Sequence, residues 1–194
     1  EIMKEAGCLG IDFGVDSGDD EILKNLKRDF QVNDVIKTAE ICNSLNITFM
    51  YDLLIGGPGE TNNTIKNTIE LMKEIHPDRI GLSIGVRIYP GTKLSKIVVE
   101  QGSIQQNPNI FGVTDKNPNF LKPIFYLSAE LKGKKCFSYI SRLVGKDPMF
   151  FFADPEETDQ NYNYNENLIL VNAIQKGYRG AYWDILRRLA NKKS

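Results

Sequence analysis

The sequence is poor in the residues that build metal centres and disulfide frameworks. It has three cysteines, Cys8, Cys42 and Cys136, and one histidine, His76. The cysteines are odd in number and widely spaced, so they predict neither a disulfide framework nor a CxxC or CxxxCxxC ligand set. We expect them to be small packing residues of a protein in the reducing cytoplasm. His76 lies just before Pro77 at an expected helix end, which favours a structural role over catalysis or metal binding.

An excess of one charge and long apolar runs are also lacking. The chain has 24 Lys and Arg residues against 25 Asp and Glu residues, which gives no electrostatic case for binding nucleic acid or a membrane surface. No apolar run approaches the roughly 20 residues that span a bilayer, and no signal peptide is visible. The chain opens with Glu1 in what reads as the middle of a helix. We interpret this opening as a cut from a longer protein.

A weak repeat, in which a helix end is followed by a strand, is the first positive signal. Segments rich in β-forming residues follow expected helix ends at 8–15, 47–55 and 79–88. Amphipathic helices are expected between them, over 33–45 from a possible cap at Asn33 and over 62–75. This alternation predicts an α/β fold of βα units with parallel strands, either half of a TIM-type β/α barrel or part of a doubly wound sheet.

The second expected strand has one apolar face and one mixed face. Its apolar face is Ile47, Phe49, Tyr51, Leu53 and Ile55, and the other face includes Asp52. A strand that is apolar on both sides except for one acid suits a parallel sheet covered by helices.

The pattern changes near residue 102, and we predict two parts. Residues 1–102 would be the barrel half, and residues 103–194 a loop-rich, mainly helical C-terminal extension. Within the extension, helices are expected over 134–145 and roughly 168–191, with Trp183 at the edge of the last apolar face. The acidic, Asn-rich run 153–167 is expected to be exposed.

Two strand ends carry an acid followed by glycine. Asp52 opens the stretch Asp-Leu-Leu-Ile-Gly-Gly-Pro-Gly-Glu-Thr, whose Gly56, Gly57 and Gly59 would let the backbone approach a ligand before a helix N-terminus. A tight βα turn with a capped helix explains the glycines equally well, but it does not explain Asp52. Ligands of β/α barrels bind at the C-terminal ends of the strands.

The other strand end is Gly14-Val-Asp16-Ser-Gly18, followed by Asp19 and Asp20 at a helix start. The last two acids are expected to cap the helix, whereas Asp16 should point into the barrel mouth. Arg28 follows the short helix, and the sequence leaves open whether it faces the site or the solvent. The same is true of Arg87, before a Pro-Gly-Thr turn.

The three stretches together resemble the radical S-adenosylmethionine (SAM) superfamily. GVDSGDDEIL…KR, DLLIGGPGET and YPGTKL occur in order over residues 7–95. They are similar to the strand motifs of the branch that holds oxygen-independent coproporphyrinogen oxidases, methylthiotransferases and cobalamin-binding radical SAM proteins. YRGAYWDILRRL and FLKPIFYLS resemble the C-terminal region of the cobalamin branch more weakly.

The resemblance implies a cofactor site. It assigns SAM contacts to Asp16 and Asp52 and to Gly56, Gly57 and Gly59, and it assigns the methionine carboxylate of SAM to Arg28. Asp16 departs from the usual, longer Glu or Gln. The parent protein would be an Fe–S oxidoreductase that cleaves SAM reductively to a 5′-deoxyadenosyl radical and then abstracts hydrogen from an unknown substrate. It would use a [4Fe–4S] cluster and possibly cobalamin.

The cluster-binding half of the family barrel, with its CxxxCxxC motif, is missing from this sequence. Three thiolates are needed for the cluster, so we predict no metal site and no activity for this chain alone. Its open barrel edge should favour self-association.

Two other classes stay open. The chain could belong to an ordinary TIM-barrel enzyme that uses Asp16 and Asp52 as an acid/base pair, and this reading would gain if the full-length protein lacked a cysteine triad. It could also be a non-catalytic scaffold, which would gain if the strand-end acids formed salt bridges away from the mouth.

Overall fold

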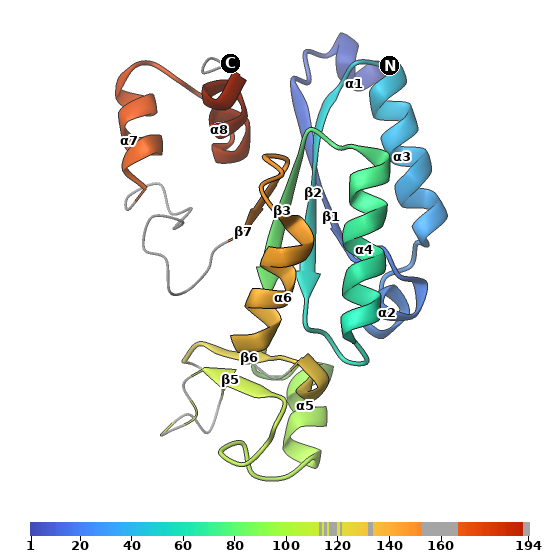
Figure 1. The fold of residues 1–194 in the computed structure, drawn as a ribbon, viewed down its shortest axis with the longest axis vertical. Helices are drawn as coiled ribbons and strands as arrows, with labels where there is room; N and C mark the ends of the chain where they lie inside the picture. Colours follow the sequence, from blue (N-terminus) through green and yellow to red (C-terminus); the bar gives the residue numbers. More distant parts are fainter. Residues whose placement is uncertain are drawn as a thin grey trace.

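The expected strands gather into one parallel sheet (Figure 1). The computed structural model describes residues 1–112, 114, 116, 120, 122–131, 134–152 and 167–191. The sheet has the strand order β1 (Gly10–Asp16), β2 (Thr48–Ile55), β3 (Arg79–Ile84) and β7 (Phe150–Phe152), and every neighbouring pair is parallel. The predicted α/β fold and the order of the first three strands are confirmed. Self-association through the edge at β1 stays a prediction.

The third strand is shorter than the expected 79–88. It ends at Ile84 because Gly85 has a left-handed backbone (φ 90°), and the Gly85 amide donates to the carbonyl oxygen of Ile55 at 2.7 Å. The chain then enters a second, antiparallel sheet of β4 (Val86–Arg87), β6 (Ile124–Tyr126) and β5 (Ile110–Gly112).

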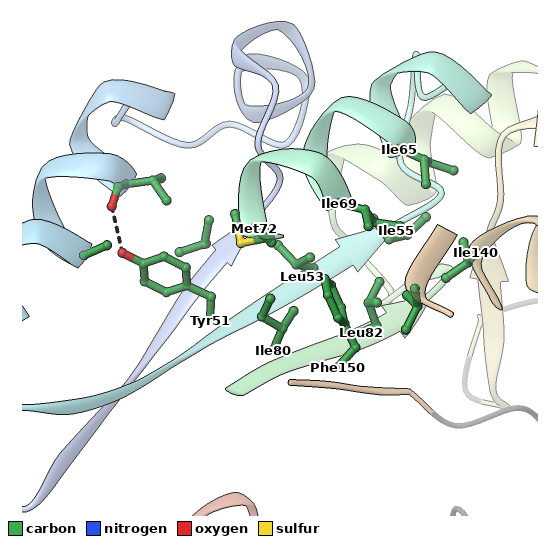
Figure 2. Close-up of a cluster of buried hydrophobic side chains, with 14 of the residues drawn as sticks. Tyr51, Leu53, Ile55, Ile65, Ile69, Met72, Ile80, Leu82, Ile140 and Phe150 are labelled. Atoms are coloured by element: carbon green, nitrogen blue, oxygen red, sulfur yellow. Dashed lines mark hydrogen bonds between the residues drawn. The ribbon is translucent and has the colours of Figure 1, made fainter. Parts of the chain in front are cut away.

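Helices α3 (Val32–Ser44), α4 (Asn62–Ile75) and α6 (Lys134–Val144) pack on one face of the parallel sheet and enclose the main core (Figure 2). Apolar side chains at helical spacing on α4 meet the alternate residues of β2. The Tyr51 hydroxyl donates to the Val35 carbonyl oxygen at 2.7 Å and so satisfies a buried polar group. The predicted apolar face of residues 47–55 is therefore the core face.

The ends of these helices depend on local capping. The Thr61 hydroxyl accepts from the Thr64 amide at 3.2 Å at the start of α4, and His76 ends that helix in a left-handed conformation (φ 48°). Helix α3 begins earlier than the expected Asn33 cap. Its N-cap is Gln31, whose amide donates to the Asp34 carboxylate at 2.9 Å. Helix α1 (Ile2–Glu5) precedes the first strand.

The second part of the chain is only partly helical. The expected helix over 134–145 is α6, but the helix expected over 168–191 is two helices, α7 (Leu168–Gln175) and α8 (Tyr182–Asn191), separated by a turn with two glycines. Helices α2 (Asp20–Asn25) and α5 (Lys93–Glu100) and the 3₁₀ turn η1 (Ala129–Leu131) complete the elements of the described residues. The acidic run lies outside the described residues, apart from Asn167.

Strand β7 was not predicted from the sequence, and it returns the second part of the chain to the parallel sheet. The domain boundary at residue 102 stays a prediction.

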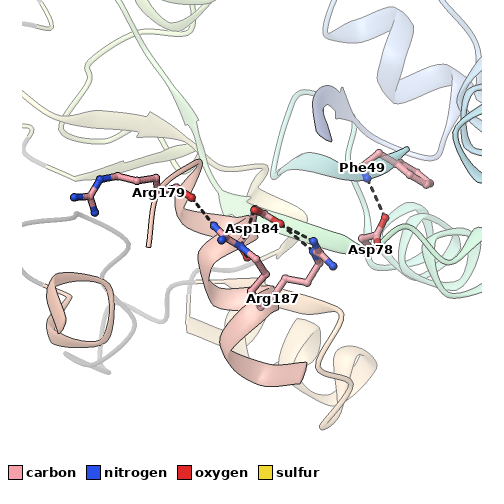
Figure 3. A network of polar contacts seen from close by, with 6 residues as sticks. Phe49, Asp78, Arg179, Asp184 and Arg187 are labelled. Atoms are coloured by element: carbon pink, nitrogen blue, oxygen red, sulfur yellow. Dashed lines mark hydrogen bonds and ion pairs between the residues drawn. The ribbon is translucent and has the colours of Figure 1, made fainter. Parts of the chain in front are cut away.

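Helix α8 packs toward the sheet face opposite the core. Trp183 is buried, and its ring lies 3.1 Å from the position that a Cβ atom on Gly10 would occupy. Asp184 accepts a hydrogen bond from Arg187 at 2.7 Å and pairs with Arg188 at 3.0 Å (Figure 3). Arg188 also donates to the Arg179 carbonyl oxygen in the preceding turn. These contacts hold the first turn of α8 in place.

The core predicts that two isoleucines on neighbouring helices contribute very differently to the free energy of unfolding. Ile69 on α4 is 1% exposed and Ile41 on α3 is 57% exposed. We expect Ile69→Ala to lower the free energy of unfolding by about 2–5 kcal/mol because it leaves a cavity. Ile41→Ala should change it by less than about 0.5 kcal/mol. Urea unfolding followed by circular dichroism measures both. Equal losses would contradict this description of the core.

Candidate functional site

The first strand ends in an aspartate that is held by an arginine. Asp16 is 7% exposed and has a left-handed backbone (φ 65°), at the point where the register with β2 shifts. The Arg28 Nε atom donates to Asp16 Oδ2. Arg28 follows α2 (Asp20–Asn25), and its side chain is 41% exposed. Arg28, whose orientation the sequence left open, therefore reaches the end of the strand.

Of the two neighbouring acids, Asp19 caps α2 as expected, whereas Asp20, which was expected to cap the same helix, binds the start of α3 instead. Asp19 Oδ1 accepts from the amides of Glu21 at 3.0 Å and Ile22 at 3.2 Å, at the start of α2. Asp20 Oδ1 accepts from the Val32 amide at 2.8 Å, at the start of α3. Neither side chain is therefore available for the site.

Asp52 lies on the open face of the sheet, opposite the core. In the register, its neighbours on that face are Gly14 on β1 and Gly81 on β3. A Cβ atom on Gly81 would lie only 2.0 Å from Asp52 Oδ1, so the carboxylate occupies the space that this glycine leaves. Arg28 Nη2 lies 3.9 Å from the Cβ position of Gly14. The structure thus places Asp16, Arg28 and Asp52 on one face of adjacent strands.

The Asp52 carboxylate has no hydrogen-bond or ion-pair partner within the described residues. Burial, together with the charges of Asp12 and Asp16, raises its pKa to about 6. At neutral pH the carboxylate is therefore mostly ionised, in a half-buried position that favours a cation or hydrogen-bond donors.

Two amides of the loop Gly56–Gly59 bind a side chain of the protein itself. The amides of Gly56 and Gly57 both donate to Glu60 Oε2, the second at 3.0 Å. A Cβ atom on Gly56 would lie 2.4 Å from Leu127, and one on Gly59 would lie 2.7 Å from Asn25. The missing side chains therefore make room for neighbouring protein groups. A cofactor contact of Gly56, Gly57 and Gly59 stays a prediction.

Glu60 is the residue that the sequence reasoning missed. It is fully buried, and its Oε1 atom has no hydrogen-bond partner among the described groups. Burial raises its pKa to about 7, although the bonds from Gly56 and Gly57 act in the opposite direction. An acid directly after Gly-Gly-Pro-Gly was a visible signal, because a carboxylate can turn back to the amides of such a loop.

Arg87 contacts aromatic rings rather than the Asp16–Arg28 pair. Its guanidinium group stacks on the rings of Tyr89, at 5.4 Å from the centroid, and Phe125, at 5.6 Å. These cation–π contacts explain its position without a ligand.

A cavity of about 340 Å³ opens on the Asp52 side of β3. Its lining residues are Asp52, Gly81, Leu82, Ser83, Ile84, Gly85, Phe111, Phe125, Phe137, Phe151 and Tyr182. This volume lies in the range of small-molecule sites, ~300–1,000 Å³.

The described residues do not fit an iron–sulfur cluster. Cys8, Cys42 and Cys136 are free thiols, and within the described ranges no group of three His, Cys, Asp or Glu side chains could hold a metal ion. In the same part of the chain, no helix is long and apolar enough to cross a membrane.

Residues 1–72 match the model of the radical SAM superfamily. A tryptophan 2-C-methyltransferase of Streptomyces laurentii is 21% identical over 229 residues, covering 94% of this chain and 38% of the relative. A probable threonylcarbamoyladenosine tRNA methylthiotransferase of Methanocaldococcus jannaschii is 41% identical over 69 residues, which is 33% of this chain and 16% of the relative.

The fold is that of the radical SAM partial barrel. The structure of TsrM from Kitasatospora setae, a radical SAM methyltransferase with tryptophan substrate and a SAM analogue bound, superposes with a TM-score of 0.82. It is 22% identical, and the match covers 99% of this chain and 43% of that one. Another TsrM structure, with cobalamin and a [4Fe–4S] cluster bound, superposes with a TM-score of 0.79 at 19% identity. This match covers 96% of this chain and 41% of that one. This chain thus spans less than half the length of these relatives.

The buried Glu60 carboxyl predicts a pH dependence of stability. Its pKa rises from 4.5 to about 7 on folding, so between these values the folded state holds a proton that the unfolded state has released. The free energy of unfolding should therefore be highest below the lower pKa and fall as pH rises through the upper one, by at most ~1.4 kcal/mol per pH unit.

Glu60→Gln should remove this slope, because glutamine does not titrate. Urea unfolding at a series of pH values would compare it with the wild type and with Glu70→Gln, whose side chain in the native protein is 60% exposed. An unchanged slope in Glu60→Gln would contradict the assignment.

Proposed function

We propose that this chain is the SAM-holding part of a radical SAM enzyme that transfers a methyl group. The observation that carries the proposal is the Asp16–Arg28 pair on the open face of the partial barrel. The relatives named above are methyltransferases and a methylthiotransferase, and these names give no support to the oxidoreductase label expected from the sequence.

Arg28 would hold the methionine carboxylate of SAM. Its Nε atom is taken by Asp16, and its two terminal nitrogens make no hydrogen bond to described residues. Those two N–H groups can bind a carboxylate in a bidentate pair, which is strong and directional. Asp16 would then act as a positioning residue that aims the guanidinium group. This role differs from the direct SAM contact expected for Asp16 from the sequence.

In the whole protein, a [4Fe–4S] cluster would supply the electron that cleaves SAM. Since the described residues do not fit a cluster, we expect this chain alone to bind SAM without cleaving it. TsrM also binds cobalamin, and we propose cobalamin as a further cofactor of the whole protein.

One observation favours the acid/base alternative. The pKa of Asp52 is about 6, which lies within the range of a general base. This alternative needs Asp16 as a second free acid, but Asp16 is paired with Arg28. The scaffold alternative needs the acids to point away from the mouth. Asp16 is indeed in a salt bridge, but both acids lie on the open face.

Titration calorimetry with SAM tests the proposal. We expect Arg28→Gln to weaken binding about tenfold to a hundredfold, because a charged hydrogen-bond donor to the carboxylate is lost. Arg142→Gln is the control, since Arg142 lies over the Tyr139 ring on α6. Asp16→Asn should weaken binding less than Arg28→Gln. Unchanged SAM affinity in Arg28→Gln would contradict the proposal.

A further inference from the structure

The cavity beside Asp52 is lined by aromatic rings from five separate elements. They are Phe111 on β5, Phe125 on β6, Phe137 on α6, Phe151 on β7 and Tyr182 on α8. Phe151 and Tyr182 form an edge-to-face pair with ring centroids 5.9 Å apart. Phe111 is 47% exposed. The rings face open space here, whereas rings that only fill a core are covered by other side chains.

Asp52 is the one carboxylate among the described residues that line the cavity, and neighbouring residues fix its position. Gly81, the β3 residue level with Asp52, leaves the space that the carboxylate occupies. The residue level with Gly81 on the next strand is Phe151. The same row of the sheet thus presents a negative group and an aromatic ring side by side, with no described cation paired to the carboxylate.

We propose that this cavity binds the substrate of the enzyme, and that the substrate is a planar aromatic compound whose ammonium group pairs with Asp52. The rings would stack on or edge against the aromatic part, and the carboxylate would select the positive charge. The identification of this ligand as the substrate rests on the proposed function.

The cavity and the SAM-holding pair are neighbours without overlapping. Arg28 lies over Gly14 on the β1 side of Asp52, whereas the cavity lies on the β3 side. Neither Arg28 nor Asp16 lines the cavity. Two ligands could therefore lie side by side across β2, which is the geometry that transfer of a group between them needs. This arrangement assigns Asp52 to the substrate, where the sequence had suggested SAM.

Titration calorimetry with three probes tests the chemistry of the cavity. Tryptamine carries a ring and an ammonium group, indole-3-propionate carries a similar ring with the opposite charge, and 2-cyclohexylethylamine carries the ammonium without the aromatic ring. We expect tryptamine to bind at least about tenfold more tightly than either of the others. Equal binding of tryptamine and indole-3-propionate would overturn the role of Asp52, and equal binding of the two amines would overturn the role of the rings.

Variants locate the binding. Asp52→Asn should weaken tryptamine binding about tenfold or more. Asp12→Asn, the same change on the same face but outside the cavity lining, should have a much smaller effect, because it removes only a neighbouring charge. Gly81→Ala keeps the carboxylate but forces it to move, and it should weaken tryptamine binding as well. Equal effects of Asp52→Asn and Asp12→Asn would overturn the proposal.

Competition with SAM separates this proposal from the previous one. We expect SAM and tryptamine to bind together, with Arg28→Gln weakening only SAM and Asp52→Asn weakening only tryptamine. If SAM displaces tryptamine and Asp52→Asn weakens both, the cavity holds the adenine of SAM and the substrate assignment is wrong. If Arg28→Gln leaves SAM binding intact while tryptamine still depends on Asp52, the SAM site as proposed fails and the cavity stands.

Discussion

The pairing register of β2 is the constraint on which the rest of the molecule depends. This strand lies between β1 and β3, and its alternation sends Tyr51 and Leu53 into the core while Asp52 faces the open side. Because side chains alternate, a slip of one residue would bury the carboxylate under α4 and expose the apolar residues. The fold and the candidate site are thus set by the same pairing, and neither can change without the other.

The two acids of the open face have different surroundings, and this difference gives them different chemistry. Asp16 is nearly buried but meets the Arg28 guanidinium, which compensates its charge within the protein. Asp52 is more exposed, but burial and two neighbouring carboxylates raise its pKa. A compensated carboxylate suits positioning, whereas an uncompensated one suits a ligand that brings a positive charge. The sequence presents both simply as acids near strand ends.

Local patterns predicted most of the parallel sheet, because adjacent βα units leave few topologies open. The sequence also placed Asp16 and Asp52 on neighbouring strands, since strand ends of a parallel sheet share one edge, but it left open where Arg28 points. It failed where distant segments meet. Strand β7 has three residues and pairs with β3 about 70 positions earlier. A segment this short shows no alternation of apolar and polar residues that could predict a strand. The aromatic cavity was invisible for the same reason, because its rings come from five elements.

The glycine loop shows how a motif can be located correctly while its physical role differs from the expected one. Its amides at Gly56 and Gly57 bind Glu60, and the Gly56 carbonyl oxygen accepts from the Ser128 amide at 2.9 Å. Ser128 lies two residues after β6, which carries Phe125 into the cavity wall. The buried carboxylate of Glu60 therefore fixes the loop through its amides, and the loop in turn fixes the chain after β6 through the Gly56–Ser128 hydrogen bond. Even where no ligand touches these glycines, the close approach that they permit helps to fix the position of Phe125 in the cavity wall.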